Sequence, residues 1–336
     1  MDDCLLLDAG SGGRASQRLI AQCFMHHFAN PLLERMDDAA LLTDISGPLA
    51  MSTDSYTVTP LFFAGGSIGS LAVHGTVNDV AMLGARPRYL SCGFILEEGL
   101  PLETLERVVA DMGAAAREAG VSIVTGDTKV VPRGKADRLF INTAGIGMVS
   151  HRCEISGKRA RPGGAVLVSG TLADHGITIM SSQAGIAIGG DIKSDTQPLH
   201  RLVGALLEDY NCQVHVLRDP TRGGLATTLC EIAASSRVRI AIDEDQLPIR
   251  PAVAAACEMI GLDPLYLANE GKCVLICDAR AEGAILHLLR SLPEGRDAAL
   301  IGRVEAGNDG RVSLTTRIGG SRLLEPLTGL PLPRIC

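Results

Sequence analysis

Six aspartates lie where a carboxylate can be presented to a ligand. They are Asp37, Asp38, Asp54, Asp79, Asp127 and Asp219. Asp54, Asp127 and Asp219 each follow an apolar segment that we expect to be a strand. Carboxylates at strand ends can converge on one Mg²⁺–phosphate cluster, because hard cations prefer oxygen ligands. The alternative for any one of them is a structural role as a helix cap or a turn residue.

Asp79 fits the structural alternative least well. It lies beside Asn78 inside residues 68–84, whose apolar periodicity predicts a helix. An ionised group on an apolar helix needs a partner. We therefore predict that Asp79 serves a bound metal ion and nucleotide, with Asn78 beside it.

Glycines ahead of an expected helix form a second candidate site. Gly10, Gly12 and Gly13 precede a helical stretch at 16–28, and their backbone N–H groups can cradle phosphate. A flexible N-terminal turn explains the same residues equally well. The chain has neither a P-loop nor a complete dinucleotide fingerprint, so any ATP site must be of another kind.

Two further residues have side chains suited to proton transfer. Lys129 follows an expected strand in the segment Gly-Asp-Thr-Lys, and Glu270 precedes another in Asn-Glu-Gly-Lys. Lys129 can act as a phosphate counter-ion or proton acceptor, and Glu270 as a general base. A solvated lysine and a turn carboxylate are the structural alternatives.

The chain ends in a cysteine. Cys336 follows Pro331, Pro333, Arg334 and Ile335, and the segment from Pro326 onward is expected to be extended and poorly tied down. A thiol on such an arm can be modified in one place and delivered to another. A chance exposed cysteine is the alternative, although free exposed thiols are a liability.

Composition bounds the class of protein that positions these residues. A length of 336 residues suggests two domains. Aromatic residues make up only 3% and the net charge is −7 without a basic cluster, which argues against nucleic-acid binding. No apolar stretch is long enough to span a membrane, and the N-terminus does not resemble a signal peptide. We expect a cytoplasmic protein that acts on neither nucleic acid nor membrane.

Helical and strand patterns alternate through both halves. The basic, turn-rich segment 159–164 is the best boundary. We predict a glycine-rich segment (1–36), an ATP-binding and dimerisation domain (37–158), an α+β domain (159–320) and a mobile tail (321–336). Expected strands are 49–53, 88–96, 121–125, 139–149, 165–169, 214–217, 239–242, 273–277 and 299–304. Expected helices after the first two are 101–120, 196–209, 223–234, 251–260 and 281–291.

Nine short segments carry a resemblance to a known family. The chain resembles the HypE family of carbamoyl dehydratases, which mature [NiFe]-hydrogenases, and more widely the superfamily of aminoimidazole ribonucleotide synthetase, selenophosphate synthetase and thiamine-monophosphate kinase. The matching segments are GSGGR (10–14), DDAAL (37–41), STDSY (52–56), GTVNDVA (75–81), GDTKVV (126–131), NTAGIG (142–147), RDPTRGGL (218–225), NEGK (269–272) and PRIC (333–336). The terminal PRIC is the most specific of them.

The resemblance implies a fold, cofactors and partners. It implies an α+β protein of two α/β-layered domains, the first pairing with its copy into a central β-barrel of a homodimer and the second of split-βαβ type. A carbamoyltransferase, HypF, would load Cys336, and ATP with Mg²⁺ would drive conversion of the thiocarboxamide to a thiocyanate. The cyano group would then pass to an iron centre on the HypC–HypD scaffold complex.

The residue roles follow from this chemistry. The six aspartates would hold Mg²⁺ and, with Gly10, Gly12, Gly13 and Asn78, the nucleotide, while Lys129 and Glu270 would take the nitrogen protons. A small-molecule kinase or selenophosphate synthetase is an alternative, although the glycine loop holds Ser11 where the latter carries a reactive Cys or Sec. A non-enzymatic thiol carrier is the other, and it would leave the aspartates without a role. ATP hydrolysis separates the carrier from the enzymes, and a kinase does not need the tail.

Overall fold

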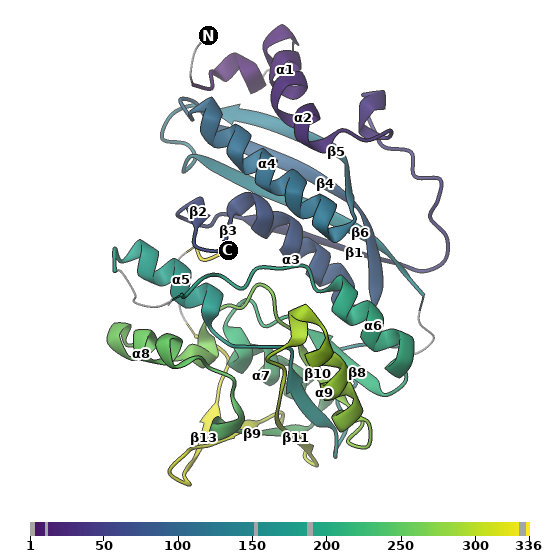
Figure 1. Ribbon diagram of the computed structural model, residues 1–336, viewed down its shortest axis with the longest axis vertical. Coiled ribbons are helices and arrows are strands. Elements are labelled where there is room, and N and C mark those ends of the chain that lie inside the picture. The colour runs from purple at the N-terminus through teal and green to yellow at the C-terminus, as the bar shows by residue number, and fades with distance from the viewer. Residues whose placement is uncertain (1–3, 11–12, 151–153, 187–190, 329–333) are drawn as a thin grey trace.

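The structure is a computed structural model, and it describes residues 4–10, 13–150, 154–186, 191–328 and 334–336. Two mixed α/β domains lie one above the other, and the C-terminus returns to the N-terminal domain near the β2–β3 hairpin (Figure 1). The chain therefore has the expected α+β fold of two layered domains. The described part of one chain forms open sheets and no closed barrel.

The N-terminal sheet has the strand order β1-β6-β4-β5. Helices α3 and α4 pack on one face of it, and the short N-terminal helices lie beyond α4 (Figure 1). The elements are η1 (Leu7–Gly10), α1 (Gly13–Leu19), the π-helix η2 (Ile20–Phe24), α2 (Met25–Phe28), η3 (Leu33–Arg35), β1 (Leu49–Tyr56), β2 (Phe62–Phe63), β3 (Gly66–Ser67), α3 (Ile68–Met82), β4 (Ala85–Glu97), α4 (Leu102–Ala119), β5 (Ser122–Val131) and β6 (Leu139–Val149).

Local sequence rules account well for α4. Pro101 precedes the helix, its apolar face is buried, and Gly120 ends it in the left-handed conformation at φ 64°. Gly69 of α3 lets the two helices approach closely, because a Cβ there would collide with the Val108 carbonyl. The predicted helices at 68–84 and 101–120 are confirmed.

Three N-terminal strands are longer than predicted. β1 continues to Tyr56 and β5 to Val131, so Asp54, Asp127 and Lys129 lie within strands and not after them. β4 begins at Ala85 and includes Pro87, because β5 pairs with β4 only from Tyr89 onward. The absent N–H of Pro87 therefore costs no ladder bond on that side.

The C-terminal sheet has the strand order β13-β12-β9-β11-β7-β10-β8. Its predicted strands and four helices are confirmed with small shifts of boundary, while α5, β12 and β13 were not predicted. The elements are β7 (Ala165–Val168), α5 (Asp174–Gln183), α6 (His200–Tyr210), β8 (Val214–Arg218), α7 (Gly224–Ser236), β9 (Arg239–Asp243), η4 (Glu244–Gln246), α8 (Pro251–Ile260), η5 (Pro264–Tyr266), β10 (Val274–Cys277), α9 (Glu282–Ser291), η6 (Pro293–Gly295), β11 (Ala299–Glu305), β12 (Val312–Thr315) and β13 (Ser321–Leu324).

Both faces of the strands β7, β10 and β8 of this sheet are buried. Val166 and Val168 of β7 pack toward α7, whereas Leu167 between them packs toward α6 and α9. A strand buried on both faces is a continuous apolar run, and its short length between turn residues distinguishes it from a helix. Because β13 is a strand of this sheet, the prediction of a mobile tail beginning at residue 321 is wrong for 321–324.

Helix α3 lies between the domains and is buried on nearly every side. It contacts α6 and β8 of the C-terminal domain as well as β1 and β6 of its own. Asp79, the only acidic residue of α3, is thereby placed next to the segment that follows β8.

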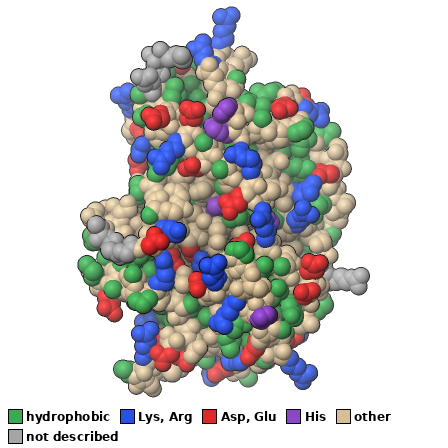
Figure 2. All heavy atoms as spheres, in the orientation of Figure 1, with side chains coloured by type: hydrophobic (Ala, Val, Ile, Leu, Met, Phe, Trp, Pro, Cys, Tyr) green, Lys and Arg blue, Asp and Glu red, His purple; other side chains and the backbone are tan. Residues whose placement is uncertain are grey.

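No helix in the described ranges is both long and apolar enough to cross a membrane. Acidic and basic side chains are interspersed over the face in Figure 2.

Candidate active site

Three of the predicted aspartates converge at the domain interface. Asp54 projects from β1, Asp79 from α3, and Asp219 from the segment after β8. They line a cavity of about 540 Å³ together with Ser52, Arg218 and Arg222. These aspartates lie far apart in the sequence, and the packing of α3 against β1 and β8 brings them to one place.

The three carboxylates differ in their environments. The Ser52 hydroxyl donates to Asp79 at 2.6 Å, and burial raises the pKa of Asp79. Arg222 donates to Asp54 at 2.7 Å. Burial, and then the neighbouring charge of Asp79, raise the pKa of Asp219 to about 7. A cluster this rich in acid is deficient in positive charge, which suits a cation and the phosphates that accompany it.

Glu270 lies buried behind this cluster, with 4% of its surface exposed. Its Oε1 has no hydrogen-bond partner. Burial raises the pKa of Glu270 well above the usual range, and the charge of Asp219 adds to this. A carboxylate with a high proton affinity suits the acceptance of a proton from a substrate.

Asn78 holds the segment that carries Glu270. Its Nδ2 donates to the Glu270 carbonyl at 3.1 Å and to the Gln197 carbonyl at 3.0 Å, and its Oδ1 accepts from Leu199 N–H at 2.7 Å. The amide is thus occupied by backbone groups. The structure places Asn78 as a support for the site, and its predicted contact with nucleotide stays a prediction.

The residues after Glu270 pack against a buried ion pair. Lys272 Nζ lies 3.6 Å from Asp195 Oδ2, and Asp195 Oδ1 accepts from the Glu270 N–H at 3.0 Å. A Cβ on Gly271 would collide with the Asp195 carbonyl. The segment Asn-Glu-Gly-Lys is therefore held rigidly, with only the Glu270 carboxyl group lacking a partner among its described side chains.

The C-terminus docks into the same interface. The Cys336 carboxylate accepts from the Thr57 N–H at 3.1 Å and the Thr57 hydroxyl at 3.2 Å. Arg334 Nε donates to the Thr57 carbonyl at 2.8 Å, and its guanidinium pairs with Asp137. The expectation of a poorly tied end is wrong for residues 334–336, because these contacts and the burial of Ile335 hold them.

Docking places the Cys336 thiol beside the acid cluster. Burial, and then the charges of Glu270 and Asp54, raise the pKa of Cys336 to about 12, and Arg222 opposes them. The thiol is therefore protonated and weakly nucleophilic while docked.

We expect Cys336 in the native protein to react with iodoacetamide at pH 8 at least about 10-fold more slowly than in the urea-denatured chain, because thiolate is the nucleophile. Its rate should keep rising with pH beyond the ordinary thiol pKa of 9.0. Intact-mass spectrometry with fragmentation of the protein measures this. A native rate that levels off near pH 9 would mean that the tail is not docked in solution.

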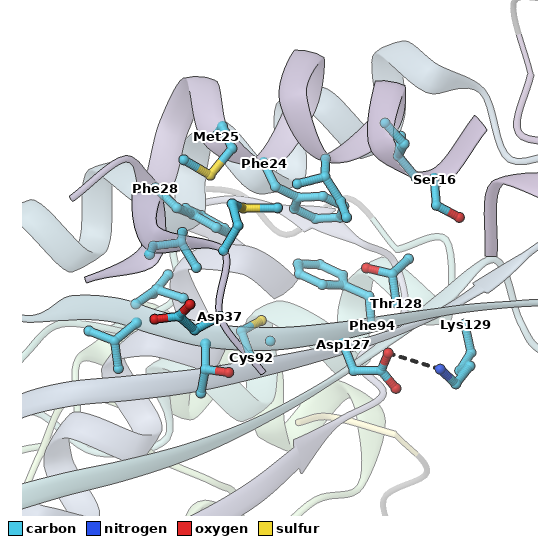
Figure 3. Close-up of a pocket in the computed structure, with 18 of the residues that line it drawn as sticks. Ser16, Phe24, Met25, Phe28, Asp37, Cys92, Phe94, Asp127, Thr128 and Lys129 are labelled. Atoms are coloured by element: carbon cyan, nitrogen blue, oxygen red, sulfur yellow. Dashed lines mark hydrogen bonds and ion pairs between the residues drawn. The ribbon is translucent and has the colours of Figure 1, made fainter. Parts of the chain in front are cut away.

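The remaining predicted residues do not join this site within one chain. Gly10, Asp37, Asp127 and Lys129 line a separate cavity of about 350 Å³ beneath the N-terminal helices. In Figure 3 apolar side chains, among them Phe24 and Phe28, surround this cavity, while Asp127 and Lys129 lie at its edge. Lys129 Nζ donates to Asp127 Oδ1 at 2.9 Å. A single chain therefore separates Lys129 from Glu270, which were predicted to share one proton-transfer step.

Structural contacts account for several of these residues. Asp37 pairs with Arg35 at 3.0 Å, and Asp38 is exposed. Gly10 packs so closely on β5 that a Cβ would collide with the Val130 backbone. Gly13 has φ 72°, and the predicted Gly12 lies outside the described residues.

A closed metal site is absent from the described ranges, since no three His, Cys, Asp or Glu side chains there are grouped to hold an ion by themselves. Asp54, Asp79 and Asp219 fit a different arrangement. Mg²⁺ commonly takes one or two protein carboxylates and completes its shell with water and substrate phosphates. An open acidic cavity with raised pKa values is consistent with that arrangement.

Comparison with known proteins gives the family. Residues 36–149 match the model of the AIR synthase related protein N-terminal domain, and residues 161–315 match that of its C-terminal domain. Carbamoyl dehydratase HypE of Azotobacter vinelandii is 52% identical over 327 residues, covering 97% of this chain and 96% of its own. The chain belongs to the HypE family of carbamoyl dehydratases.

Solved structures of the HypE family share the fold closely. A crystal structure of hydrogenase maturation protein HypE in complex with ATP is 58% identical, covering 99% of this chain and 100% of that chain, with a TM-score of 0.96. A crystal structure of a HypE–HypF complex contains a chain that is 46% identical. The match covers 92% of this chain and 99% of that chain, with a TM-score of 0.81. The predicted resemblance is thus confirmed over nearly the whole chain.

Three residues at this site were missed from the sequence. Arg222 lies in the quoted segment RDPTRGGL but was not singled out, although an arginine beside an expected metal-binding aspartate was an available signal. Thr57 and His175 contact the docked tail through Cys336 and Ile335. No sequence pattern distinguishes them, because their contacts join segments far apart in the chain.

Proposed function

We propose that this chain uses ATP and Mg²⁺ to dehydrate a carbamoyl group carried on the Cys336 thiol, and so supplies the cyanide ligand for [NiFe]-hydrogenase assembly. The observation that carries the proposal is the docked tail. It places the thiol next to Glu270, Asp54 and Arg222, at the edge of the cavity lined by Asp79 and Asp219. Membership of the HypE family supports the same reaction.

The reaction has to remove oxygen and two protons from a thiocarboxamide. ATP, when bound, supplies the phosphoryl group that converts the carbonyl oxygen into a leaving group. Cys336–S–C(=O)–NH₂ then becomes Cys336–S–C≡N, the nitrogen loses two protons, and the oxygen departs in phosphate. Glu270, whose buried carboxyl group lacks a partner at Oε1, is the acceptor we propose for a nitrogen proton.

The acid cluster would hold the charged part of the nucleotide. Asp54, Asp79 and Asp219 would contact Mg²⁺, and Arg222 would balance negative charge near the thiol. The crystal structure of a HypE in complex with ATP supports the binding of nucleotide. Asp37, Asp38 and Asp127, also predicted as metal ligands, can contribute only if another chain brings them close.

We propose a homodimer that does so. The face of the N-terminal sheet opposite α3 exposes Leu49, Met51 and Ile95, with 49%, 69% and 45% of their surfaces accessible. Such a face is suited to pairing with a copy of itself. Lys129 and Asp127 lie on a neighbouring strand of that sheet, so pairing is the route by which they would approach a second active site.

Loading of the carbamoyl group and delivery of the cyano group require the tail to leave its docked position. We propose HypF as the carbamoyl donor enzyme, as the complex of HypE and HypF suggests, and the HypC–HypD complex as the acceptor of the cyano group. The docked thiol is half-buried, so loading would proceed from an undocked state.

Incubation with HypF, carbamoyl phosphate and Mg-ATP tests the proposal. We expect intact-mass spectrometry to find a thiocarboxamide and then a thiocyanate on Cys336, with ADP formed in step. Cys336→Ala should bind ATP and carry neither group, whereas Cys230→Ala, at a buried cysteine of α7, should behave like the unaltered protein. A modification that persists in Cys336→Ala would contradict the proposal.

A further inference from the structure

His175 makes a contact with the tail that the chemistry above does not use. It lies on α5 and is fully buried. Its Nε2 lies 2.6 Å from the Ile335 carbonyl oxygen, one residue before Cys336. Its Nδ1 lies 2.8 Å from Ser194 Oγ, and the Phe63 ring packs edge-on at 5.7 Å between centroids.

These contacts determine which nitrogen carries the proton. A carbonyl oxygen only accepts hydrogen bonds, so Nε2 must be the donor toward Ile335. Burial lowers the pKa of His175, so the ring is neutral and Nδ1 accepts from the Ser194 hydroxyl. Ser194 Oγ in turn accepts from the Thr196 N–H at 3.2 Å. The chain of bonds leaves one orientation for the imidazole.

The same helix contacts the tail a second time. Gln183 Nε2 donates to the Arg334 carbonyl at 3.3 Å and to the Thr59 carbonyl at 2.9 Å. Two successive carbonyl groups of the tail are thus bound from α5 of the C-terminal domain. Thr57 of the N-terminal domain binds the terminal carboxylate that follows them.

Burial of the Ile335 side chain fixes the register of the tail against α5. It is 7% exposed and packs in the core of the N-terminal domain, where Ile179 of α5 also contributes. A shift of the tail by one residue would place Arg334 or Cys336 in the apolar position. Backbone contacts and the isoleucine pocket therefore decide together where the thiol lies.

We propose that His175 is a positioning residue, which through its Nε2–H bond to the Ile335 carbonyl holds the tail in the register that presents the Cys336 thiol to Glu270. The positioning role stands on the docked contacts alone, whereas its consequence for catalysis rests on the proposed function. Loss of one buried hydrogen bond should shift the balance between docked and undocked tail by about 5–10-fold.

The test compares His175→Leu, which removes the donor, with His175→Gln, which keeps an N–H donor near the place of Nε2. His215→Leu is the matched control, since His215 is a buried histidine of β8 whose Nε2 faces Asp278 and not the tail. Iodoacetamide labelling of Cys336, thermal unfolding and ATP binding are measured for each protein.

We expect His175→Leu to label about 5–10-fold faster than the unaltered protein, with ATP affinity unchanged. His175→Gln should restore slow labelling at least in part, and Ser194→Ala should accelerate it less than His175→Leu does. His215→Leu should label at the original rate. Once the tail is carbamoylated, the maximal rate of thiocyanate formation should fall in His175→Leu and recover in His175→Gln.

Two results would overturn the proposal. One is an unchanged labelling rate in folded His175→Leu, and the other is equal acceleration in the Leu and Gln variants. If His175→Leu does not fold, the Ser194→Ala labelling rate decides, and an unchanged rate counts against the proposal. Faster labelling in His175→Leu together with no thiocyanate from any protein, including the unaltered one, would retain the positioning role and contradict the proposed function instead.

Discussion

Glu270→Gln is expected to lower thiocyanate formation by at least about 100-fold, the usual contribution of a positioned acid or base. Glutamine has the same shape but takes up no proton. The variant keeps Asp54, Asp79 and Asp219, the side chains proposed to contact Mg²⁺. ATP binding and thermal stability should therefore stay close to those of the unaltered protein. Single-turnover conversion of the carbamoylated tail, followed by mass spectrometry, measures the loss.

Lys129→Ala is the informative comparison for Glu270→Gln. Lys129 lies in the other cavity of the same chain, paired with Asp127. An equal loss in Lys129→Ala would show that the two cavities meet in the working enzyme, as the proposed dimer requires. Lys135→Ala, at an exposed lysine, controls for the loss of a surface charge. Conversion at the normal rate by Glu270→Gln would remove Glu270 from the proton-transfer step.

Asp219→Asn is expected to abolish ATP turnover while making the metal-free protein more stable at pH 8. The folded protein holds the pKa of Asp219 near 7, above the ordinary 3.8. A raised acid pKa favours the folded state below pH 4, and this advantage is lost as the pH rises through 7. Asparagine carries no charge, so the variant does not lose this stability as the pH rises. The variant should thus unfold at least about 2 °C higher at pH 8, and the difference should vanish near pH 4.

With Mg-ATP present, the unaltered protein should unfold at a higher temperature than Asp219→Asn at pH 8. Mg-ATP should raise the unfolding temperature of the unaltered protein at pH 8, because ligands stabilise the state that binds them, and should leave Asp219→Asn nearly unchanged. Differential scanning calorimetry with EDTA or with Mg-ATP measures both effects. Asp209→Asn, at an exposed aspartate of α6, serves as the control. If Asp219→Asn is less stable than the unaltered protein in EDTA at pH 8, the folded state does not raise the pKa of Asp219.

Much of the fold was predictable because its signals are local. The apolar face of α4, with Pro101 before it and Gly120 after it, determines one helix from a few adjacent residues. The continuous apolar runs of β7 and β10 predict buried strands in the same way. Helix α5 was missed because Asp-His-Gly-Ile-Thr-Ile has weak helical propensity, and packing against α8 and Leu267 decides its conformation.

The candidate site was predicted in part for a related reason. Asp54, Asp79, Asp219, Glu270 and Cys336 were identified by residue type and motif, and the structure brings them together. Asp37, Asp127 and Lys129 had equally good signals, yet within the chain they lie elsewhere. Residue type shows which side chains are capable of a reaction, whereas their distance from one another depends on how distant segments pack.

Residue types and short motifs are enough to predict the family, the alternation of helices and strands, and a thiol at Cys336 that can carry a group. The packing of distant segments, in contrast, determines that β1 and β5 run through Asp54 and Asp127, that residues 334–336 dock, and that the pKa of Glu270 is raised. Each of these depends on contacts between segments far apart in the chain. Hydrogen bonds from Thr57 and His175 hold the tail, and desolvation by both domains sets the proton affinity of Glu270. No stretch of adjacent residues encodes either effect.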